Sequence, residues 1–368
     1  MTLASRLPAF TWDRIAPLRE KAGQHPDGPV DLSVGTPVDP VPGVIREALA
    51  GASDSPGYPA TWGTPRLRSA AAGWLARAHG VQVAPDDVLP VIGTKELIAW
   101  LPAMLGLGPG DLVVHPELAY PTYDIGARLA GATPVASDRL PPAGRDRVKL
   151  VWVNSPSNPT GRVLSAEQLR TTVGQARERG AVLASDECYI SLGWEASPVS
   201  VLDPGVCGAS RDGILAVHSL SKRSNLAGYR AGFVTGDPAL VADLLAISKQ
   251  AGMMVPGPVQ AAMTAALEDD AHAGEQRQRY ARRRSALREA FVSAGWTVDH
   301  SEAGLYLWVT HPAHDCWSAA ELLAAQAGIL VAPGELYGAA GGRHVRVALT
   351  ATDERIAAAA RRLADLRG

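Results

Sequence analysis

The chain has 368 residues, of which 46% are hydrophobic and 20% charged, and its formal net charge at pH 7 is −2. This length exceeds that of a typical single domain and predicts two domains of ordinary globular composition. The near-neutral charge argues against nucleic acid as the main partner.

Neither a membrane span nor a secretion signal is expected. The longest nearly apolar stretch, Leu97 to Leu107, is too short to cross a bilayer. Residues 1–15 lack the basic start and apolar centre of a signal peptide. The three cysteines, Cys188, Cys207 and Cys316, are scattered and imply no disulfide framework. We therefore expect a cytoplasmic protein without a membrane partner.

Short apolar runs alternate with helical patterns from residue 85 to residue 235. The runs are Val88–Ile92, Leu112–Val114, Thr133–Ala136, Leu150–Val153, Val182–Ser185, Ile214–Val217 and Ala231–Thr235. Between the first two runs, apolar residues recur at the spacing of one helix face, and Gly93-Thr94 can begin that helix. Near-continuous apolar strands separated by helices predict an α/β fold with a mostly parallel, seven-stranded sheet.

The pattern changes near residue 269. We expect helices at Glu275–Ala294, Ser318–Ala327 and Asp353–Leu366, and strands at Thr297–Asp299, Gly304–Val309, Ile329–Ala332 and His344–Leu349. Met1 to Gly43 is rich in proline and glycine and shows no alternation of strands and helices. We assign residues 44–268 to a large domain, and residues 1–43 together with 269–368 to a smaller α+β domain.

Two local patterns in the second part have plain interpretations. Five arginines crowd the first of its helices: Arg277, Arg279, Arg282, Arg283 and Arg284. Because acidic residues share that helix, we expect a solvated charged face and no nucleic-acid contact. His311, His314 and Cys316 have a loosely metal-like spacing, but no fourth ligand is near, so no metal site is expected.

Polar residues follow four of the predicted elements, where open α/β sheets place their ligands. The loop NSPSNPTG after the fourth run contains two prolines and a glycine, which predict a rigid turn presenting Asn158. Asp186, in DECY, ends a buried run, where a carboxylate is costly unless it is paired. Gly93-Thr94-Lys95 can form an anion site at a helix start. Taken singly, these are also features of ordinary turns and helix caps.

The fourth feature is Lys222, in the segment SLSKRSNLAGYR that follows the sixth run. Lysine is rarely buried without a partner. The hydroxyls of Ser219 and Ser221 precede it and Arg230 follows it. An amine that must be neutral part of the time, beside a dianion that must be held, suits a lysine forming a Schiff base with pyridoxal 5'-phosphate.

In this order and spacing, the set NPTG, DExY and SxSK…GxR resembles the class I/II aminotransferases of the fold-type-I pyridoxal-phosphate family. The resemblance extends from Ser33-Val34-Gly35-Thr36-Pro37 to Val345-Arg346-Val347. It implies a pyridoxal-phosphate-dependent aminotransferase with the fold-type-I architecture, acting as a homodimer with shared active sites. Residues 221–233 look most like the actinobacterial N-succinyl-diaminopimelate aminotransferases.

The family's cofactor-binding roles carry over by resemblance. Lys222 is then the Schiff-base lysine and proton shuttle, and Asp186 the partner of the pyridine nitrogen. Tyr189 and Asn158 hydrogen-bond the ring oxygen, and Tyr120, with Tyr123 as its rival, stacks on the ring. The phosphate-binding positions are Thr94, Lys95, Ser219, Ser221 and Arg230, with Tyr58 reaching the phosphate of the neighbouring subunit.

The resemblance also implies the substrate contacts. Arg346, with Gly35 and Asn158, clamps the α-carboxylate, because a planar guanidinium matches a carboxylate bidentately. The donor would be glutamate and the acceptor N-succinyl-2-amino-6-oxopimelate, in lysine and diaminopimelate biosynthesis. A second arginine should meet the distal carboxylate, and Arg14, Arg66 and Arg223 are the candidates. The alternatives are an aminotransferase for aspartate, alanine or an aromatic amino acid, or a carbon–sulfur β-lyase on the same scaffold.

Overall fold

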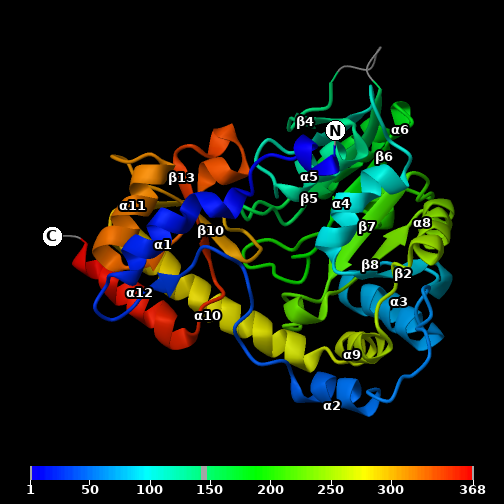
Figure 1. The fold of residues 1–368 in the computed structure, drawn as a ribbon, viewed down its shortest axis with the longest axis horizontal. Coiled ribbons are helices and arrows are strands. Elements are labelled where there is room, and N and C mark those ends of the chain that lie inside the picture. Colours follow the sequence, from blue (N-terminus) through cyan, green and yellow to red (C-terminus); the bar gives the residue numbers. More distant parts are fainter. Residues whose placement is uncertain (1, 142–146, 367–368) are drawn as a thin grey trace.

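The structure, a computed structural model, describes residues 2–141 and 147–366. All seven predicted runs are strands of one sheet, so the predicted α/β fold is confirmed (Figure 1). In spatial order the strands are β2 (Val88–Ile92), β8 (Ala231–Gly236), β7 (Ile214–Ser219), β6 (Val182–Asp186), β5 (Val148–Asn154), β3 (Leu112–His115) and β4 (Thr133–Ala136). Only β8 runs antiparallel to its neighbours.

Helices cover both faces of this sheet. They are α2 (Gly43–Gly51), α3 (Pro65–His79), α4 (Thr94–Met104), α5 (Thr122–Ala130), α6 (Ala166–Glu178), α7 (Pro204–Cys207), α8 (Pro238–Ala251) and α9 (Gly257–Glu268). Successive strand residues point to opposite faces. In β5, Val151 and Val153 join the core with α3, α6 and α9, whereas Leu150 and Trp152 join the core with α4, α5 and α8.

The helix boundaries follow from capping. Thr64 Oγ1 accepts a hydrogen bond from the backbone N–H of Leu67 and is followed by Pro65, which is suited to the first turn of α3. Gly80 ends that helix with φ 68°, a left-handed conformation that glycine adopts without steric cost. Within the described residues, no helix is both long and apolar enough to cross a bilayer.

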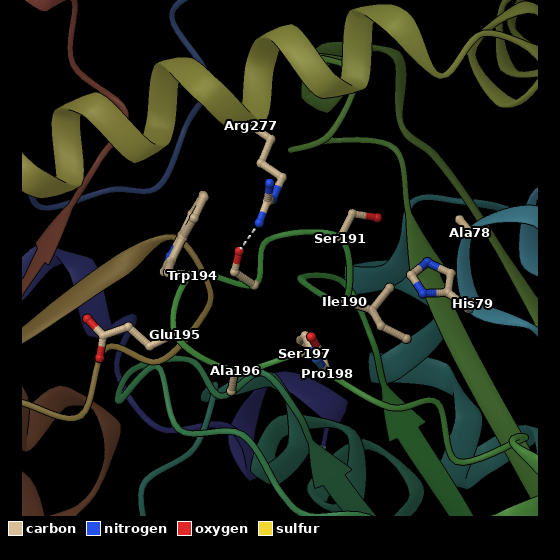
Figure 2. Close-up of a pocket in the computed structure, with 11 residues that line it drawn as sticks. Ala78, His79, Ile190, Ser191, Trp194, Glu195, Ala196, Ser197, Pro198 and Arg277 are labelled. Atoms are coloured by element: carbon tan, nitrogen blue, oxygen red, sulfur yellow. Dashed lines mark hydrogen bonds between the residues drawn. The ribbon is translucent and has the colours of Figure 1, made fainter.

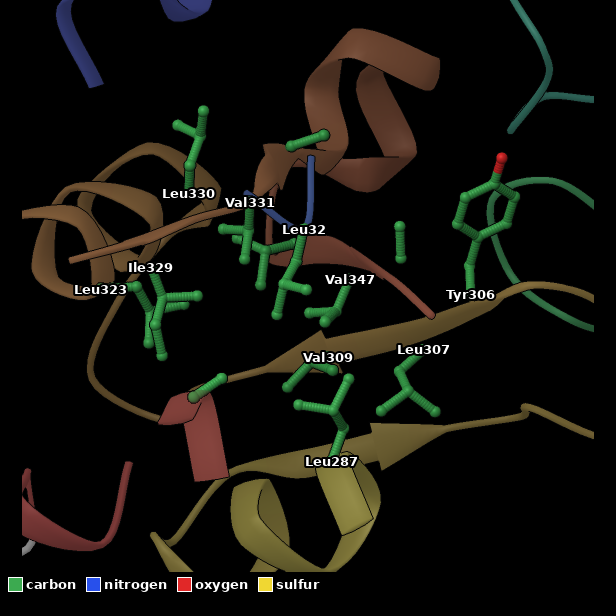
Figure 3. Close-up of a cluster of buried hydrophobic side chains, with 14 of the residues drawn as sticks. Leu32, Leu287, Tyr306, Leu307, Val309, Leu323, Ile329, Leu330, Val331 and Val347 are labelled. Atoms are coloured by element: carbon green, nitrogen blue, oxygen red, sulfur yellow. The ribbon is translucent and has the colours of Figure 1, made fainter. Parts of the chain in front are cut away.

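A smaller sheet lies at the other end of the molecule (Figure 1). Its order is β12 (Ala332–Pro333), β13 (His344–Ala348), β10 (Tyr306–Thr310) and β9 (Thr297–Asp299). Helices α10 (Ala271–Ser293), α11 (Cys316–Ala327) and α12 (Asp353–Asp365) pack around it, and Figure 3 shows the aliphatic core that they enclose. The long α10 connects this part with the layer of α9 (Figure 1).

Three expectations for these regions need correction. Residues 1–43 do contain regular structure, namely α1 (Ala16–Gly23) and β1 (Val30–Asp31). The predicted strand at 329–332 is two strands, because β11 (Ile329–Leu330) pairs with β1, whereas β12 turns to pair with β13. The arginines of α10 do not all form a solvated face, since Arg283 and Arg284 are buried in ion pairs with acidic side chains of other segments.

Candidate active site

Two of the predicted site residues, Asp186 and Ser219, end the neighbouring strands β6 and β7. Asn154 ends β5 beside Asp186, and its Nδ2 donates to the Asp186 backbone carbonyl at 2.9 Å. Asn154 Oδ1 accepts the backbone N–H of Asn158 at 2.7 Å. These bonds fix the loop of Asn158 against the carboxyl end of the sheet.

The Asp186 carboxylate is 4% exposed, and the described residues offer it no cationic side chain as a salt-bridge partner. Tyr123 Oη donates to Oδ2 at 2.7 Å, and the backbone N–H of Cys188 donates to Oδ1 at 3.1 Å. Burial raises the pKa of Asp186, and the hydrogen bonds from Cys188 and Tyr123 act against that rise. Such a carboxylate can accept a hydrogen bond from a cationic N–H of a bound ring.

The two rival tyrosines occupy different positions. Tyr123 is fully buried, and its ring stacks on Trp152 with the centroids 4.9 Å apart. Tyr120 meets the edge of Tyr123 at 6.0 Å and remains partly accessible. Burial raises the pKa of Tyr120 to about 12, and Asp186 lies within electrostatic reach of it. Of the two, only Tyr120 keeps part of its side chain open to a ligand.

Lys222 lies in the loop that connects β7 with β8. That loop is closed by a 3.2 Å hydrogen bond from the Leu220 N–H to the Ala231 carbonyl. Burial lowers the pKa of Lys222; Tyr306 and Cys188 raise it, and the charges of Arg346 and Arg230 lower it again. The amine is thus more easily neutral than that of an exposed lysine, and two guanidinium groups, those of Arg346 and Arg230, contribute to this.

An anion-binding corner forms at the start of α4. A Cβ on Gly93 would lie 2.3 Å from Arg230 Nη2, so the guanidinium packs directly on the helix start. No side chain caps this end, which leaves the first backbone N–H groups of the helix, from Thr94 and Lys95, without intrahelical partners. The side chain of Lys95 itself is exposed and lies near the ring of Phe10.

The serines before Lys222 complete this corner. Ser219 and Ser221 are both 8% exposed, and Ser219 Oγ accepts the Ser221 N–H at 3.1 Å. Gly232, paired with Ser219 across β7 and β8, allows the approach of α4, since a Cβ there would lie 3.1 Å from Thr94 Cγ2. Helix N–H groups, hydroxyls and the Arg230 guanidinium together suit a phosphate.

Arg346, on β13, is buried, and both of its Nη atoms donate hydrogen bonds to neighbouring oxygens. Nη1 donates to Asn158 Oδ1 at 2.8 Å and Nη2 donates to the Ser33 carbonyl at 2.6 Å, while Nε has no partner within residues 2–141 and 147–366. Its guanidinium carbon lies 3.9 Å from the ring centroid of Tyr306, 4.7 Å from Tyr337 and 5.6 Å from Trp12. Because Asn158 accepts through Oδ1, its Nδ2 is left to donate elsewhere.

Sequence reasoning missed Tyr306 and Trp12. Tyr306 is 4% exposed, and its Oη lies 3.2 Å from that of Tyr189, which is also buried. Gly35 is required by this tyrosine, because a Cβ there would lie 2.2 Å from Tyr306 Oη. Trp12 is on the short 3-10 helix Thr11–Ile15. The position of Tyr306 near the start of the predicted strand Gly304–Val309 was a usable signal, whereas nothing marked Trp12.

Four further residues proposed from the sequence make other contacts, or none, within a single chain. Tyr58 is 98% exposed. Arg66 is paired with Glu268, and Arg223 is buried over Trp74, on the α3 face of the sheet. Arg14 lies over Trp317 and 3.6 Å from Glu335. Within a single chain, Arg223 thus lies against the α3 face of the sheet, and both Arg66 and Arg14 have acidic partners.

A hollow of about 400 Å³ is separate from these residues (Figure 2). It is lined by the segment from Ile190 to Pro198, by His79 and by Arg277, whose side chain points to the Gly193 carbonyl. None of the predicted site residues lines it, and it contributes nothing to the arrangement around Lys222.

Comparison with known proteins gives one family. Residues 27–363 match the sequence profile described as "Aminotransferase class I and II". The chain is 62% identical to "4-dedimethylamino-4-oxo-anhydrotetracycline transaminase OxyQ" of Streptomyces rimosus, over 97% of this chain and 99% of that one. It is also 62% identical to "Probable aminotransferase Rv1178" of Mycobacterium tuberculosis, over 98% of this chain and 86% of that one.

The fold is shared with solved structures of such enzymes. The "probable N-succinyldiaminopimelate aminotransferase" of Thermus thermophilus superposes with a TM-score of 0.86 and is 28% identical, covering 97% of this chain and 100% of that one.

Proposed function

Because the chain belongs to the class I and II aminotransferases, which are pyridoxal-phosphate enzymes, we propose that it transfers an amino group from glutamate to N-succinyl-2-amino-6-oxopimelate. The observation that carries the transamination is the half-buried amine of Lys222, whose pKa is lowered by desolvation and which feels the charges of both Arg346 and Arg230. The acceptor rests on the sequence resemblance and on the Thermus thermophilus neighbour of similar fold.

The residues of the site fit pyridoxal phosphate group by group. The start of α4 with Ser219, Ser221 and Arg230 would hold the phosphate, because it offers N–H groups, hydroxyls and a cation at one corner. The lone carboxylate of Asp186 would face the pyridine nitrogen. Tyr120 would lie against the ring, since Tyr123 is occupied by Trp152.

We assign two hydrogen-bond donors, Asn158 and Tyr189, to the oxygen on the cofactor ring. Arg346 fixes Asn158 so that Nδ2 is free to donate, and Tyr189 carries a phenol whose pKa burial raises well above its usual value. Both groups are therefore neutral donors at physiological pH. When bound, the cofactor supplies the electron sink that stabilises negative charge at the substrate Cα.

The protein's own part is binding and proton transfer. Arg346 would hold the α-carboxylate of glutamate in a fixed fork, with its Nη atoms already oriented by Asn158 and Ser33. That grip fixes the Cα–H bond relative to Lys222 Nζ. Lys222 can remove this proton because desolvation lowers its pKa, which makes the neutral base accessible.

The distal carboxylate of a succinylated acceptor requires a further cation. Arg14 is the remaining candidate of the three arginines, since it shares its short helix with Trp12, whose ring packs near Arg346. Its ion pair with Glu335 is half exposed and can exchange for a substrate carboxylate at little cost.

A second acceptor is favoured by one specific observation. The 62% identity with OxyQ spans nearly the whole of both chains and equals the identity with Rv1178. As the alternative acceptor we therefore propose a bulky polycyclic ketone, of the kind for which OxyQ is named.

One assay separates these functions. The purified protein, loaded with pyridoxal phosphate, is given glutamate and either N-succinyl-2-amino-6-oxopimelate, a tetracycline-type ketone, oxaloacetate, pyruvate or phenylpyruvate, and keto-acid product is followed. We expect ping-pong kinetics and the highest kcat/KM with the succinylated acceptor. A higher kcat/KM with any other acceptor, or release of pyruvate from cystathionine at a comparable rate, would reject this acceptor.

A further inference from the structure

Tyr306 occupies the centre of the site without having an assigned role. It is the first residue of β10, and Figure 3 shows its hydroxyl pointing away from the aliphatic core to which the next strand residues belong. Its ring meets the ring of Tyr189 edge-on, with the centroids 5.8 Å apart, and lies against the guanidinium of Arg346. Tyr306 therefore touches two of the residues to which the proposed function gives a role.

The ring of Tyr306 supports the carboxylate-binding arginine. The guanidinium carbon of Arg346 lies 3.9 Å from the ring centroid, closer than to either of the other two rings around it. A guanidinium over an aromatic face is stabilised by the negative face of the ring, and more so where water is excluded. The ring thus holds Arg346 in the plane from which it would grip a carboxylate.

The hydroxyl of Tyr306 contacts a different residue, Tyr189. It lies 3.2 Å from Tyr189 Oη, and within the described chain it makes no other side-chain hydrogen bond. Gly35 keeps this position open, since a Cβ there would lie 2.2 Å from the hydroxyl oxygen. A phenylalanine at position 306 would fill the same ring position and leave Tyr189 without this partner.

The direction of the hydrogen bond follows from counting protons. Each phenol has one proton to donate, and either of the two can donate to the other when they are alone. If Tyr189 donates to a cofactor ring oxygen, as proposed above, its proton is committed there. Tyr306 must then be the donor and Tyr189 the acceptor, which gives a chain from Tyr306 through Tyr189 to the ring oxygen.

We propose that Tyr306 is a positioning residue for the transamination, whose hydroxyl donates to Tyr189 and so strengthens the donation from Tyr189 to the cofactor ring oxygen, while its ring holds Arg346. This inference rests on the proposed function. Consecutive hydrogen bonds polarise one another, so the chain favours negative charge on the ring oxygen more than Tyr189 alone would. The side chain of Tyr306 therefore links the position of Arg346, which would bind the substrate carboxylate, with the negative charge on the cofactor ring oxygen.

The test is Tyr306→Phe, read by the pH dependence of the absorbance of the bound cofactor. Removal of the hydroxyl weakens stabilisation of the ionised ring oxygen, so the apparent pKa of this absorbance should rise by about 0.5 to 1 unit. The ring remains, so KM for glutamate should change less than about twofold. Tyr306→Leu, which also loses the ring, should show the same spectral shift and a KM about fivefold higher.

Tyr337→Phe is the matched control, because Tyr337 also packs on Arg346 but its buried hydroxyl has no hydrogen-bond partner among the residues that the structure describes. Its absorbance should titrate as in the unchanged protein. If Tyr306→Phe does not retain the cofactor, Gly35→Ala, which displaces the hydroxyl, should give the same upward shift.

The outcomes separate the two claims. If the unchanged protein shows no pH-dependent cofactor absorbance at all, the proposed function fails. If it titrates and Tyr306→Phe titrates at the same pH, the role of the Tyr306 hydroxyl is refuted while the proposed function stands.

Discussion

At the scale of single residues, the buried contact between Tyr123 and Asp186 sets the orientation of the carboxylate that we propose to face the cofactor ring. Tyr123 donates to one carboxylate oxygen at 2.7 Å, and stacking on Trp152 fixes its own ring. Because the other oxygen accepts a backbone N–H, both rotations of the carboxylate are restrained. The orientation of Asp186 is thus settled before any ligand binds.

Tyr123→Phe tests this orientation. Loss of a hydrogen bond to a carboxylate should weaken binding of pyridoxal phosphate about tenfold or more, measured by titration of the cofactor absorbance into the ligand-free protein. Tyr337→Phe removes a buried tyrosine hydroxyl that has no partner and should leave the affinity unchanged. Unchanged affinity in Tyr123→Phe would show that Asp186 needs no such support.

Much of the site could be predicted from sequence because its residues stand in short motifs. Asp186 ends β6 and Lys222 lies in the loop just beyond the end of β7, and parallel strands end at one edge of a sheet, so their meeting follows from topology. Tyr306 belongs to another sheet and reaches Tyr189 across 117 residues, a contact that no local pattern encodes. The ion pair of Arg66 with Glu268 could not be foreseen, because it depends on how α3 and α9 pack.

At the scale of elements, a network of polar side chains ties the Lys222 loop to α10 and the N-terminal segment. Asn225 donates to Gln276 Oε1 at 3.0 Å, and Gln276 Nε2 donates to Asp39 at 2.8 Å. Arg283 donates to both oxygens of Asp39, at 2.6 and 2.8 Å, and to Asp353. The loop that bears Lys222 is therefore fixed by a helix that runs between both parts of the molecule.

Arg283→Met should destabilise the protein by about 3 kcal/mol, since it leaves Asp39 buried without its cation. The measurement is chemical unfolding at pH 7. Arg282→Met, on the exposed side of the same helix, should change the free energy of unfolding by less than about 0.5 kcal/mol. Equal effects of the two substitutions would contradict the network.

The same network predicts an acid response. Burial alone would raise the pKa of Asp39, but hydrogen bonds from Arg283 and Gln276 outweigh it and the pKa is lowered. A lowered carboxyl pKa adds stability above the unfolded value near 3.8, and that stability is lost as the pH falls through the folded value. The difference in stability between the unchanged protein and Arg283→Met should therefore shrink below about pH 4.

The boundaries of an element could be predicted where one hydrophobic pattern continues through the whole element. They could not be predicted where the choice of a partner strand sets the boundary. The seven apolar runs needed only local hydrophobicity. The split between β11 and β12 depends on two different partners, β1 and β13, which the apolar stretch cannot show. Helix α1 was missed because its sequence, APLREKAG, carries few apolar residues, and only Leu18 and Ala22 are buried.

At the scale of the whole molecule, we propose two domains, with boundaries near residues 43 and 268. We also propose that the protein forms a homodimer. Tyr58 is 98% exposed, an unusual state for a tyrosine, and it follows α2, whose first turn carries another exposed apolar side chain, Val44. We propose that a second copy covers this surface and receives Tyr58 at its phosphate corner.

Tyr58→Phe distinguishes this arrangement from a self-sufficient monomer. Sedimentation should give a dimer for both proteins, and the variant should bind pyridoxal phosphate about tenfold more weakly with an unchanged melting temperature, since only a contact to the partner's ligand is lost. A monomer that binds the cofactor with full affinity would contradict the shared site.

The central claim is that the amine of Lys222 is the group that bonds covalently to the cofactor. The most direct measurement is reduction of the cofactor-loaded protein with borohydride, followed by proteolysis and mass spectrometry of the peptides. The account predicts one labelled peptide, modified at Lys222, and no label in Lys222→Ala. A label on Lys95, Lys249 or any other lysine, or no label at all, would contradict it.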